Sequence, residues 1–110
     1  MATLDPFGYF DQAANAFLLL DESTMCLQKA NRRAVEEFKP SLGVPLETLF
    51  PEVQHRRLLR RLAKGERFRQ VLERDQGGEK EKTYEVCATP VRVEEQAMVL
   101  LEVIDLSAVD

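Results

Sequence analysis

Residues 97–105, AMVLLEVID, form the stretch that decides the fold, because aliphatic side chains fill almost all of it. Successive side chains of a strand point to opposite faces of its sheet, so both faces of this segment would be apolar, with Glu102 as an interruption. A strand that is apolar on both sides must be covered on both sides, which predicts a central position. The two predicted faces are Val99, Leu101 and Val103 on one side, and Met98, Leu100 and Ile104 on the other.

A second apolar run, residues 16–20 (AFLLL), lies near the other end of the chain. The simplest arrangement that shields both runs pairs them side by side in the middle of one sheet. The chain between them must then leave the sheet and return to it. The sequence therefore predicts two adjacent central strands that are far apart along the chain.

Composition limits the classes of protein to consider. The chain has 110 residues, 45% of them hydrophobic and 31% charged, which describes one globular domain. A formal net charge of -4 argues against a nucleic-acid partner. The chain has neither an apolar run near the roughly 18 residues that span a bilayer nor a basic N-terminal leader, so we expect a cytoplasmic segment without membrane contact. Cys26 and Cys87 have no metal-ligand spacing and are expected to be small core side chains; we predict no metal site.

The remaining elements follow from local signals. Asn31 is a good N-cap and Pro40 a helix stop, while Gly65 ends a second helical pattern. The loop between these helices is expected to be anchored by Leu46, Leu49 and Phe50. In chain order the pattern predicts a helix within residues 1–14, strands at 16–20 and 25–29, a helix at 32–38, a loop at 41–51 with at most one helical turn, a helix at 52–64, and strands at 67–74, 82–93 and 97–105. Helices that interrupt an antiparallel sheet define an α+β fold.

The helix at 52–64 has two different sides. Its apolar side consists of residues at positions i, i+3, i+4 and i+7, namely His55, Leu58, Leu59 and Leu62. The other side carries arginines and Lys64. We expect this basic side to be a solvated helix face; the alternative is contact with an acidic partner or a phosphate.

Fragments in chain order carry a resemblance to a known family: AFLLLD at 16–21, ANRRA at 30–34, YEVCATP at 84–90 and VIDLS at 103–107. They resemble, in turn, the first strand, the entry to the next helix, the fourth strand and the closing segment of a PAS domain, the small sensory module of bacterial kinases and regulators. The resemblance implies a five-stranded antiparallel sheet of order 2-1-5-4-3, with helices on one face and an N-terminal cap helix. It divides the chain into a cap helix at 1–14, a PAS domain at 15–107 and, at 108–110, the start of a linker to an output domain.

By this resemblance, the inner face of the sheet is either a ligand pocket or a filled core. The candidate pocket residues are Leu18, Leu20, Phe38, His55, Leu59, Tyr84, Val86, Val99, Leu101 and Val103. Because the set is almost entirely aliphatic, a filled core without a ligand is the favoured interpretation, and a small apolar or planar ligand is the alternative.

Relatives of this kind raise two cofactors, haem and flavin. His55 lies in the helical region where haem-binding relatives carry their axial histidine, so a haem-based gas sensor is a further alternative; a hydrogen-bonded core histidine is favoured over it. Light-sensing relatives need a cysteine just after an asparagine in the helical region. Neither Cys26 nor Cys87 lies there, and we set a flavin aside.

The outer face of the sheet is too apolar to face water. We expect homodimerisation through this face and the N-terminal helix, with a monomer whose helix caps its own sheet as the alternative. The candidate interface residues are Phe7, Phe10, Phe17, Leu19, Met98, Leu100 and Ile104.

Function follows from the resemblance and not from any catalytic motif. The chain carries no nucleotide-binding loop and no set of nucleophile, base and orienting residue, so we expect this segment not to be an enzyme. The resemblance implies a sensory and dimerisation module of a histidine kinase or transcriptional regulator. It would pass its signal through Asp105 and Ser107 to an output domain in the same protein. A constitutive interaction module with a closed core is the alternative.

Overall fold

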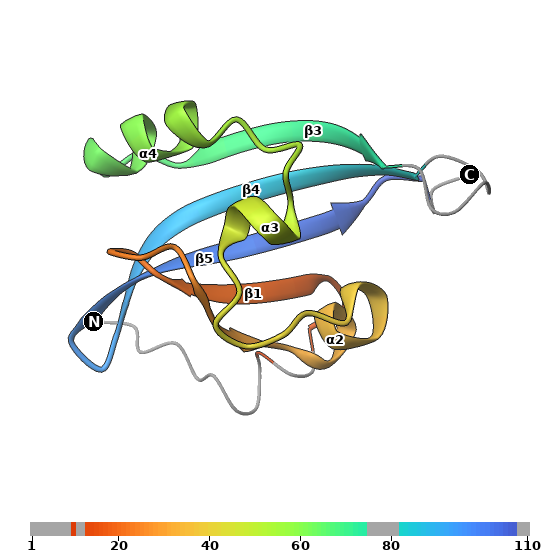
Figure 1. The fold of residues 1–110 in the computed structure, drawn as a ribbon, viewed down its shortest axis with the longest axis horizontal. Helices are drawn as coiled ribbons and strands as arrows, with labels where there is room; N and C mark the ends of the chain where they lie inside the picture. The colour runs from red at the N-terminus through yellow and green to blue at the C-terminus, as the bar shows by residue number, and fades with distance from the viewer. Residues whose placement is uncertain (1–9, 11–12, 75–81, 108–110) are drawn as a thin grey trace.

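A computed structural model of the chain describes residue 10 and residues 13–74 and 82–107. The elements in this part of the chain are ordered strand, strand, three helices and three strands (Figure 1). Their bounds are β1 Ala16–Asp21, β2 Leu27–Ala30, α2 Arg32–Phe38, α3 Leu46–Leu49, α4 His55–Ala63, β3 Phe68–Arg74, β4 Lys82–Val93 and β5 Gln96–Asp105.

The strands form one five-stranded antiparallel sheet of order β2-β1-β5-β4-β3, as predicted. The two apolar runs, β1 and β5, are neighbours in its centre, and Leu18 is the partner of Leu101 in their register. Both leucines are fully buried. The α+β class and the central pairing are therefore confirmed.

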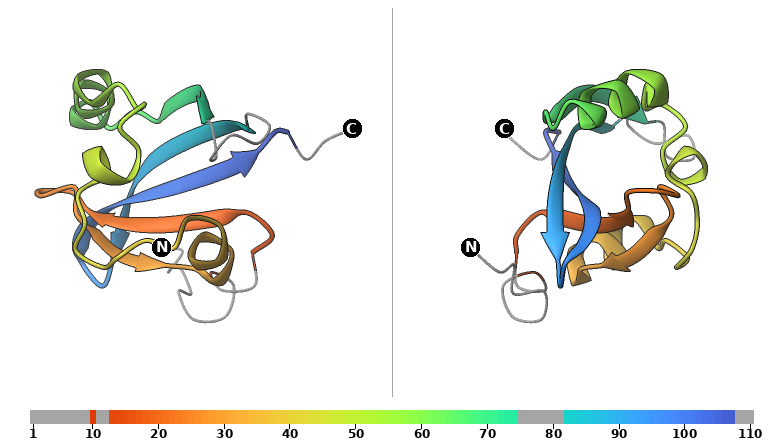
Figure 2. Two further views of the ribbon diagram at one scale, coloured as in Figure 1. Left: turned by 45° about the vertical axis from the view of Figure 1, so that its right-hand side comes forward. Right: turned by 90° about the vertical axis from the view of Figure 1, so that its left-hand side faces the viewer.

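The three helices lie on one side of the sheet (Figure 2). Helix α2 begins where the Asn31 side chain accepts a hydrogen bond from the Ala34 amide, and it ends at Lys39, which is left-handed with φ of 47° just before Pro40. Both ends lie where the local signals predicted them. Helix α3 is a single turn, within the predicted loop.

Helix α4 begins three residues later than its periodicity predicts, at His55 rather than residue 52. Side-chain hydrogen bonds from β3 occupy the backbone just before it. Gln70 donates to the carbonyl of Glu52 and accepts from the amide of Gln54, each at 2.9 Å. These tertiary contacts hold residues 52–54 in a turn, which periodicity cannot reveal.

Strand β2 is also shifted from its predicted bounds of 25–29. Met25 has a φ of 59°, so the chain is still turning there. The Met25 carbonyl accepts from the Leu46 amide at 3.0 Å, and the Leu27 amide donates to the Val44 carbonyl at 2.8 Å. The segment before α3 thus takes hydrogen bonds that a longer strand would have used.

A proline inside a strand often marks a bulge, but Pro90 causes none in β4. The pairing of β4 with β5 continues without a shift through Pro90 and its partner Val99. The pairing of β4 with β3 has ended by then, at Phe68 and Ala88. Pro90 therefore lies where β4 has a neighbouring strand on one side only, which is where a sheet tolerates the missing N–H.

The hydrophobic core lies between the sheet and the three helices. One buried polar residue, Asn31, accompanies it in the described part of the chain. Phe10 belongs to the predicted N-terminal helix and is buried, with 3% of its surface exposed. Phe7, in the predicted N-terminal helix, and residues 75–81, between the strands predicted at 67–74 and 82–93, lie outside the described residues.

Candidate functional site

The inner face of the sheet brings together most of the predicted pocket residues. Seven of the ten candidates are at most 3% exposed and belong to one hydrophobic cluster. They are Leu18, Leu20, Tyr84, Val86, Val99, Leu101 and Val103. Phe38 is half-buried and packs against this cluster, with its ring centroid 5.2 Å from that of Phe50 and 5.4 Å from that of Tyr84.

Leu59 does not belong to this group, because 49% of its surface is exposed. The core-facing stripe of α4 consists of Leu58, fully buried, and Leu62, half-buried and packed against the core. Adjacent residues of a helix lie about 100° apart around its axis, so Leu59 points away from this stripe. Helical spacing placed it within the apolar side but could not show which edge of that side meets the sheet.

The core also includes residues that were not predicted to line the site. Val53 precedes α4, Phe68 and Leu72 lie on the inner face of β3, and Leu27 lies in β2; all are at most 4% exposed. The alternating pattern of β3 could have indicated two of them, since Phe68 and Leu72 are apolar and lie on the same face of the strand. Leu46 and Phe50 are buried, as expected for loop anchors.

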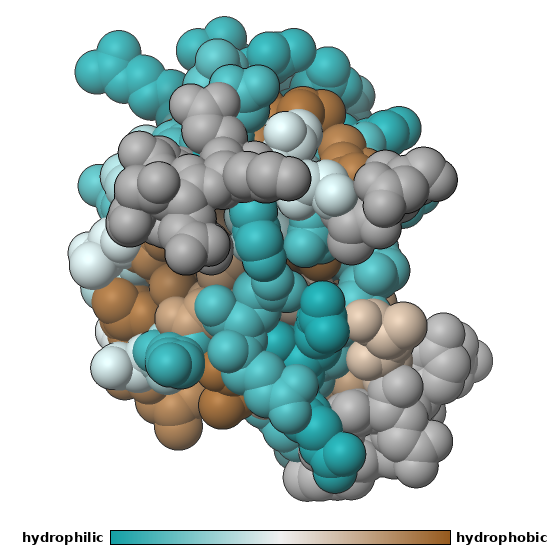
Figure 3. Space-filling view, turned by 90° about the vertical axis from the view of Figure 1, so that its right-hand side faces the viewer, coloured by the Kyte–Doolittle hydropathy of each residue, from teal (hydrophilic) through white to brown (hydrophobic). Residues whose placement is uncertain are grey.

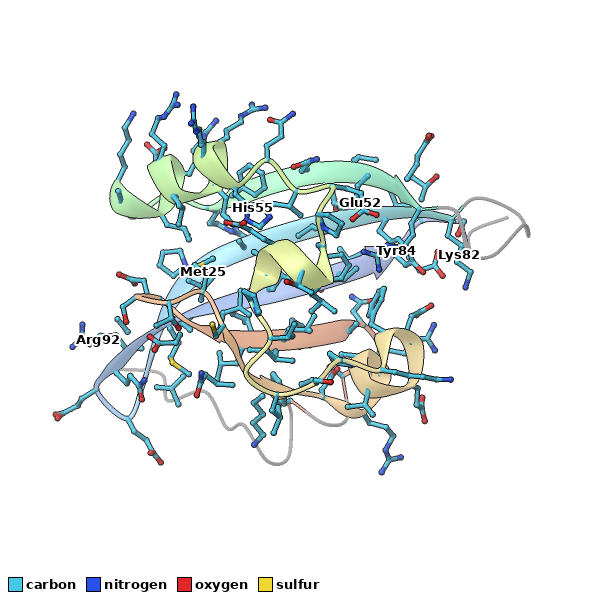
Figure 4. The ribbon with its side chains drawn as sticks, viewed as in Figure 1. Met25, Glu52, His55, Lys82, Tyr84 and Arg92 are labelled. Atoms are coloured by element: carbon cyan, nitrogen blue, oxygen red, sulfur yellow. The ribbon has the colours of Figure 1, made fainter. Side chains whose placement is uncertain are left out.

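His55 is the first residue of α4, and its side chain extends from the helix toward the sheet (Figure 4). Its Nε2 atom is buried without a hydrogen-bond partner among the described residues. A buried polar atom without a partner is costly. The expected hydrogen-bonded core histidine is therefore not observed at Nε2, and this atom is the polar group through which a ligand on this side could be held.

A charged network lies where β5 ends. The carboxylate of Glu37, on α2, is only 12% exposed; it lies 3.3 Å from Arg33 and 3.5 Å from the Lys82 amine. The Tyr84 hydroxyl donates to the same carboxylate at 3.5 Å. Lys82 also lies 3.9 Å from the carboxylate of Asp105. Hydrophilic residues run down the middle of the molecular surface seen from this end (Figure 3).

The two predicted output residues are in direct contact. One carboxylate oxygen of Asp105 accepts from the amide of Ser107 at 3.0 Å and from its hydroxyl at 2.6 Å. The network therefore links the helix above the core, the inner-facing Tyr84 and the last residues of the sheet. Sequence reasoning missed Glu37 and Lys82, since nothing in their local pattern indicates that they meet.

Arg74 connects the end of β3 to the segment between α3 and α4. Its guanidinium donates to the Leu49 carbonyl at 2.7 Å and to both carboxylate oxygens of Glu52, at 3.0 and 3.1 Å. It also lies 4.7 Å from the centre of the Phe50 ring. The hydrogen bonds from Arg74 lower the pKa of the Glu52 carboxyl.

The predicted dimer-interface residues of β1 and β5 share the outer face of the sheet. Leu19 and Met98 are buried, while Phe17, Leu100 and Ile104 are half-buried. The Phe10 ring lies 6.2 Å from that of Phe17 in the same chain. At least this part of the N-terminal segment packs on its own sheet, which is the arrangement expected of the monomeric alternative.

The two cysteines are half-buried rather than core residues. Cys87 lies on the outer face of β4, where burial raises the pKa of its thiol. The backbone of Cys26 forms an isolated antiparallel β-bridge with that of Pro45. Neither lies on a helix.

The described residues contain no group of three or more His, Cys, Asp and Glu placed to hold a metal ion. Within the same residues, no helix has both the length and the apolar character needed to cross a membrane.

Comparison with known proteins identifies the fold. No family model and no curated protein matches the sequence. Among solved structures, the PAS domain of an HTR-like protein from Haloarcula marismortui superimposes with a TM-score of 0.69 at 15% identity, over 88% of this chain and 90% of that one. The PAS domain of a nitrogen regulation protein from Vibrio parahaemolyticus gives 0.62 at 23% identity, over 87% and 93%.

A Rhodobacter sphaeroides LOV protein gives a TM-score of 0.64 at 20% identity, over 88% of this chain but only 63% of the longer protein. All three likenesses extend over nearly the whole chain at low sequence identity. Together with the strand order β2-β1-β5-β4-β3, they show that this chain has the PAS fold.

Proposed function

We propose that this chain is a sensory and dimerisation module of a signal-transduction protein, of the histidine-kinase or transcription-regulator kind. The observation that carries the proposal is the course of β5, which crosses the centre of the sheet beneath the core and ends at Asp105. Similarity to PAS domains of a two-component sensor histidine kinase and of a nitrogen regulation protein supports the same class.

The signal would leave the module through the charged network at Asp105. A shift of α2 over the core would move Glu37 and, through Lys82, the carboxylate of Asp105. Asp105 in turn holds the backbone amide of Ser107. An output domain that follows would respond because the chain after β5 leaves the sheet in a different direction or is held less firmly.

Two kinds of input suit this geometry. Complete burial of the inner-face residues favours a closed core that relays the state of a partner, or a constitutive interaction module. The unpartnered Nε2 of His55 favours a small ligand, of which haem is one. An imidazole nitrogen fits a haem iron, but the fully buried aliphatic side chains on the inner face do not fit a macrocycle without displacement. Haem therefore remains the less favoured candidate.

Native mass spectrometry of the purified chain tests the proposal. A sensory module is expected to give a dimer mass, and a bound small molecule would add its own mass. A monomer at all concentrations would contradict the dimerisation part. The lack of any added mass would contradict a tightly bound ligand and would leave the closed core that relays the state of a partner as the sensory input. An ultraviolet-visible spectrum separates the haem alternative, because a Soret band lost in His55→Ala would establish it, and the lack of such a band would exclude it.

The dimer model is tested at Leu100 rather than at Phe10, because Phe10 is buried against its own sheet and its replacement would disturb the fold. Leu100 is half-buried on the outer face and is the partner of Leu19 in β1. Leu100→Asp is expected to shift a dimer to a monomer in light scattering. Val71→Asp is the matched control and should leave the mass unchanged, because Val71 is exposed on β3 and lies on the same outer face of the sheet as Leu100. An unchanged mass in Leu100→Asp with the fold intact would contradict the model.

A further inference from the structure

Basic residues are concentrated in one short segment of this acidic chain. Seven of the 15 basic residues lie within residues 55–69, together with one acidic residue, so this segment carries a formal charge of +6. Since the chain carries -4 in total, the remainder carries -10. Such a separation of charge creates a strong local field, which acts over about 10 Å at moderate salt.

The arginines of α4 contribute little to the stability of their helix: Arg60 and Arg61 lie in its last turn, and Arg61 pairs with Glu66 at 3.3 Å on the surface, but most of the basic row is set against itself. Three pairs at i and i+4 are alike in charge, and α4 contains no acidic residue that could offset them. Like charges at this spacing destabilise a helix. These pairs are Arg56 with Arg60, Arg57 with Arg61, and Arg60 with Lys64. Packing of Leu58 holds the helix in place, so the basic row needs another explanation.

A cavity of about 480 Å³ opens beside this row. One wall comes from Arg57 and Arg61 of α4 and from Arg67, just before β3. The other wall is the outer face of the sheet, where Glu85, Glu102 and Ile104 contribute. Phe68 is shared between this lining and the core, but the other lining residues do not belong to the inner face on which the sensory proposal rests.

The two walls select the kind of anion that fits. Glu85 is already paired with Arg69, and Glu102 accepts a hydrogen bond from Asn15 at 2.8 Å. In the basic wall, Arg61 lies 3.3 Å from Glu66 at the surface, while the Arg67 side chain has no hydrogen bond or ion pair within the described residues. A nucleic acid would bring a continuous row of phosphates against both carboxylates. The aromatic residue in the lining, Phe68, is only 2% exposed and belongs to the core, so it offers no open ring on which bases could stack. A peptide can instead place single carboxylates on the arginines and an apolar side chain against Ile104.

We infer that this cavity is a docking site for an acidic segment of a partner protein, with carboxylate side chains on Arg57, Arg61 and Arg67. Guanidinium groups bind carboxylates through two parallel hydrogen bonds, which gives such a contact direction as well as attraction. The site would join the module to a neighbouring protein independently of any ligand in its core.

Fluorescence anisotropy with a labelled peptide of alternating glutamate and leucine tests the inference. The peptide is expected to bind, and the same peptide with glutamine in place of glutamate is not. Arg57→Glu with Arg61→Glu should weaken binding by at least about tenfold, and Arg67→Glu alone by a smaller factor. Added salt should weaken the wild-type complex.

The matched control is Arg32→Glu with Arg92→Glu, which changes the net charge equally at exposed positions outside the cavity. It should bind the peptide as the wild type does. An equal loss in the control would show a net-charge effect only and overturn the site. Tighter binding of an oligonucleotide of equal charge through the same arginines would overturn the choice of partner. If the chain associates with itself in a salt-dependent way and Arg57→Glu with Arg61→Glu abolishes this, the cavity binds a second copy instead. If the peptide does not bind even at low salt, the docking site is overturned and the basic row is a solvated helix face.

Discussion

The amide nitrogen of the Asn31 side chain donates a hydrogen bond to the carbonyl of Phe10 at 3.0 Å. The same nitrogen donates to the Asn15 carbonyl at 2.9 Å. The Asn31 side-chain oxygen accepts from the amides of Phe17 and Ala34, at 2.9 and 3.0 Å. One fully buried side chain thus fastens the N-terminal segment, the start of β1 and the first turn of α2 to one another.

Replacing Asn31 should therefore loosen all three segments together. Asn31→Ala is expected to lower the free energy of unfolding by about 3 kcal/mol, since it removes a helix cap and leaves buried groups unpaired. Asn31→Asp keeps the oxygen that caps α2 but turns the donor into an acceptor facing two carbonyls, and it should also destabilise. Urea unfolding measures both changes; two values near zero would show that the hydrogen bonds do not hold the segments.

The central position of β5 predicts a large effect of truncating its buried side chains. Leu101→Ala should cost about 3 kcal/mol of stability, because β5 lies between β1 and β4, the Leu101 side chain is fully buried in the core, and its removal leaves a cavity. Val71→Ala, at a position 57% exposed on the edge strand β3, should change stability by no more than about 0.5 kcal/mol. Equal losses in thermal unfolding would contradict the central placement.

Arg74 should not tolerate exchange for lysine. A lysine keeps the charge but cannot donate to both oxygens of Glu52 and to the Leu49 carbonyl, nor lie flat on Phe50. Arg74→Lys is expected to cost about 1 kcal/mol in chemical unfolding. Arg33→Lys is the control and should be close to neutral, because the Arg33 side chain is 48% exposed and contacts Glu37 through a single nitrogen.

The pairing of Glu52 with Arg74 makes a small part of the stability depend on pH. Because the pKa of Glu52 is lowered by folding, its contribution is fully present above the usual pKa of a glutamate and is lost as the pH falls through the lowered value. The pair is partly exposed, so the contribution should stay below about 1 kcal/mol. The stability difference between wild type and Glu52→Gln should therefore shrink as the pH falls from neutral to strongly acidic. A difference that is constant over this range would contradict the lowered pKa.

The hairpin between β4 and β5 can be improved. Its two connecting residues, Glu94 and Glu95, have φ values of 51° and 68°, a left-handed conformation that glutamate adopts at a cost. Glu94→Asn with Glu95→Gly is expected to raise stability by about 1 kcal/mol, because this pair suits such turns. Glu94→Gln with Glu95→Gln is the control for the lost charges and should leave stability nearly unchanged. A gain of equal size in the control would point to charge repulsion instead.

Much of the fold follows from local patterns in the sequence. The runs at 16–20 and 97–105 are apolar on both faces, and only a central pairing shields both, so the neighbours β1 and β5 could be predicted. The ends of α2 could be predicted as well, because the cap at Asn31 and the stop at Pro40 act within a few residues. The resemblance to PAS domains extended this to the strand order.

Tertiary structure decided what depends on contacts between distant residues. Periodicity gave α4 an apolar side, but only its packing against the sheet buries Leu58 and leaves Leu59 exposed. The meeting of Glu37 with Lys82 and Asp105, and of Arg74 with Glu52, joins residues that no local pattern relates. The sequence by itself determined which segments are buried, since burial follows from side-chain polarity. The folded chain alone decided which charges meet, since that depends on the exact directions in which separate elements present their side chains.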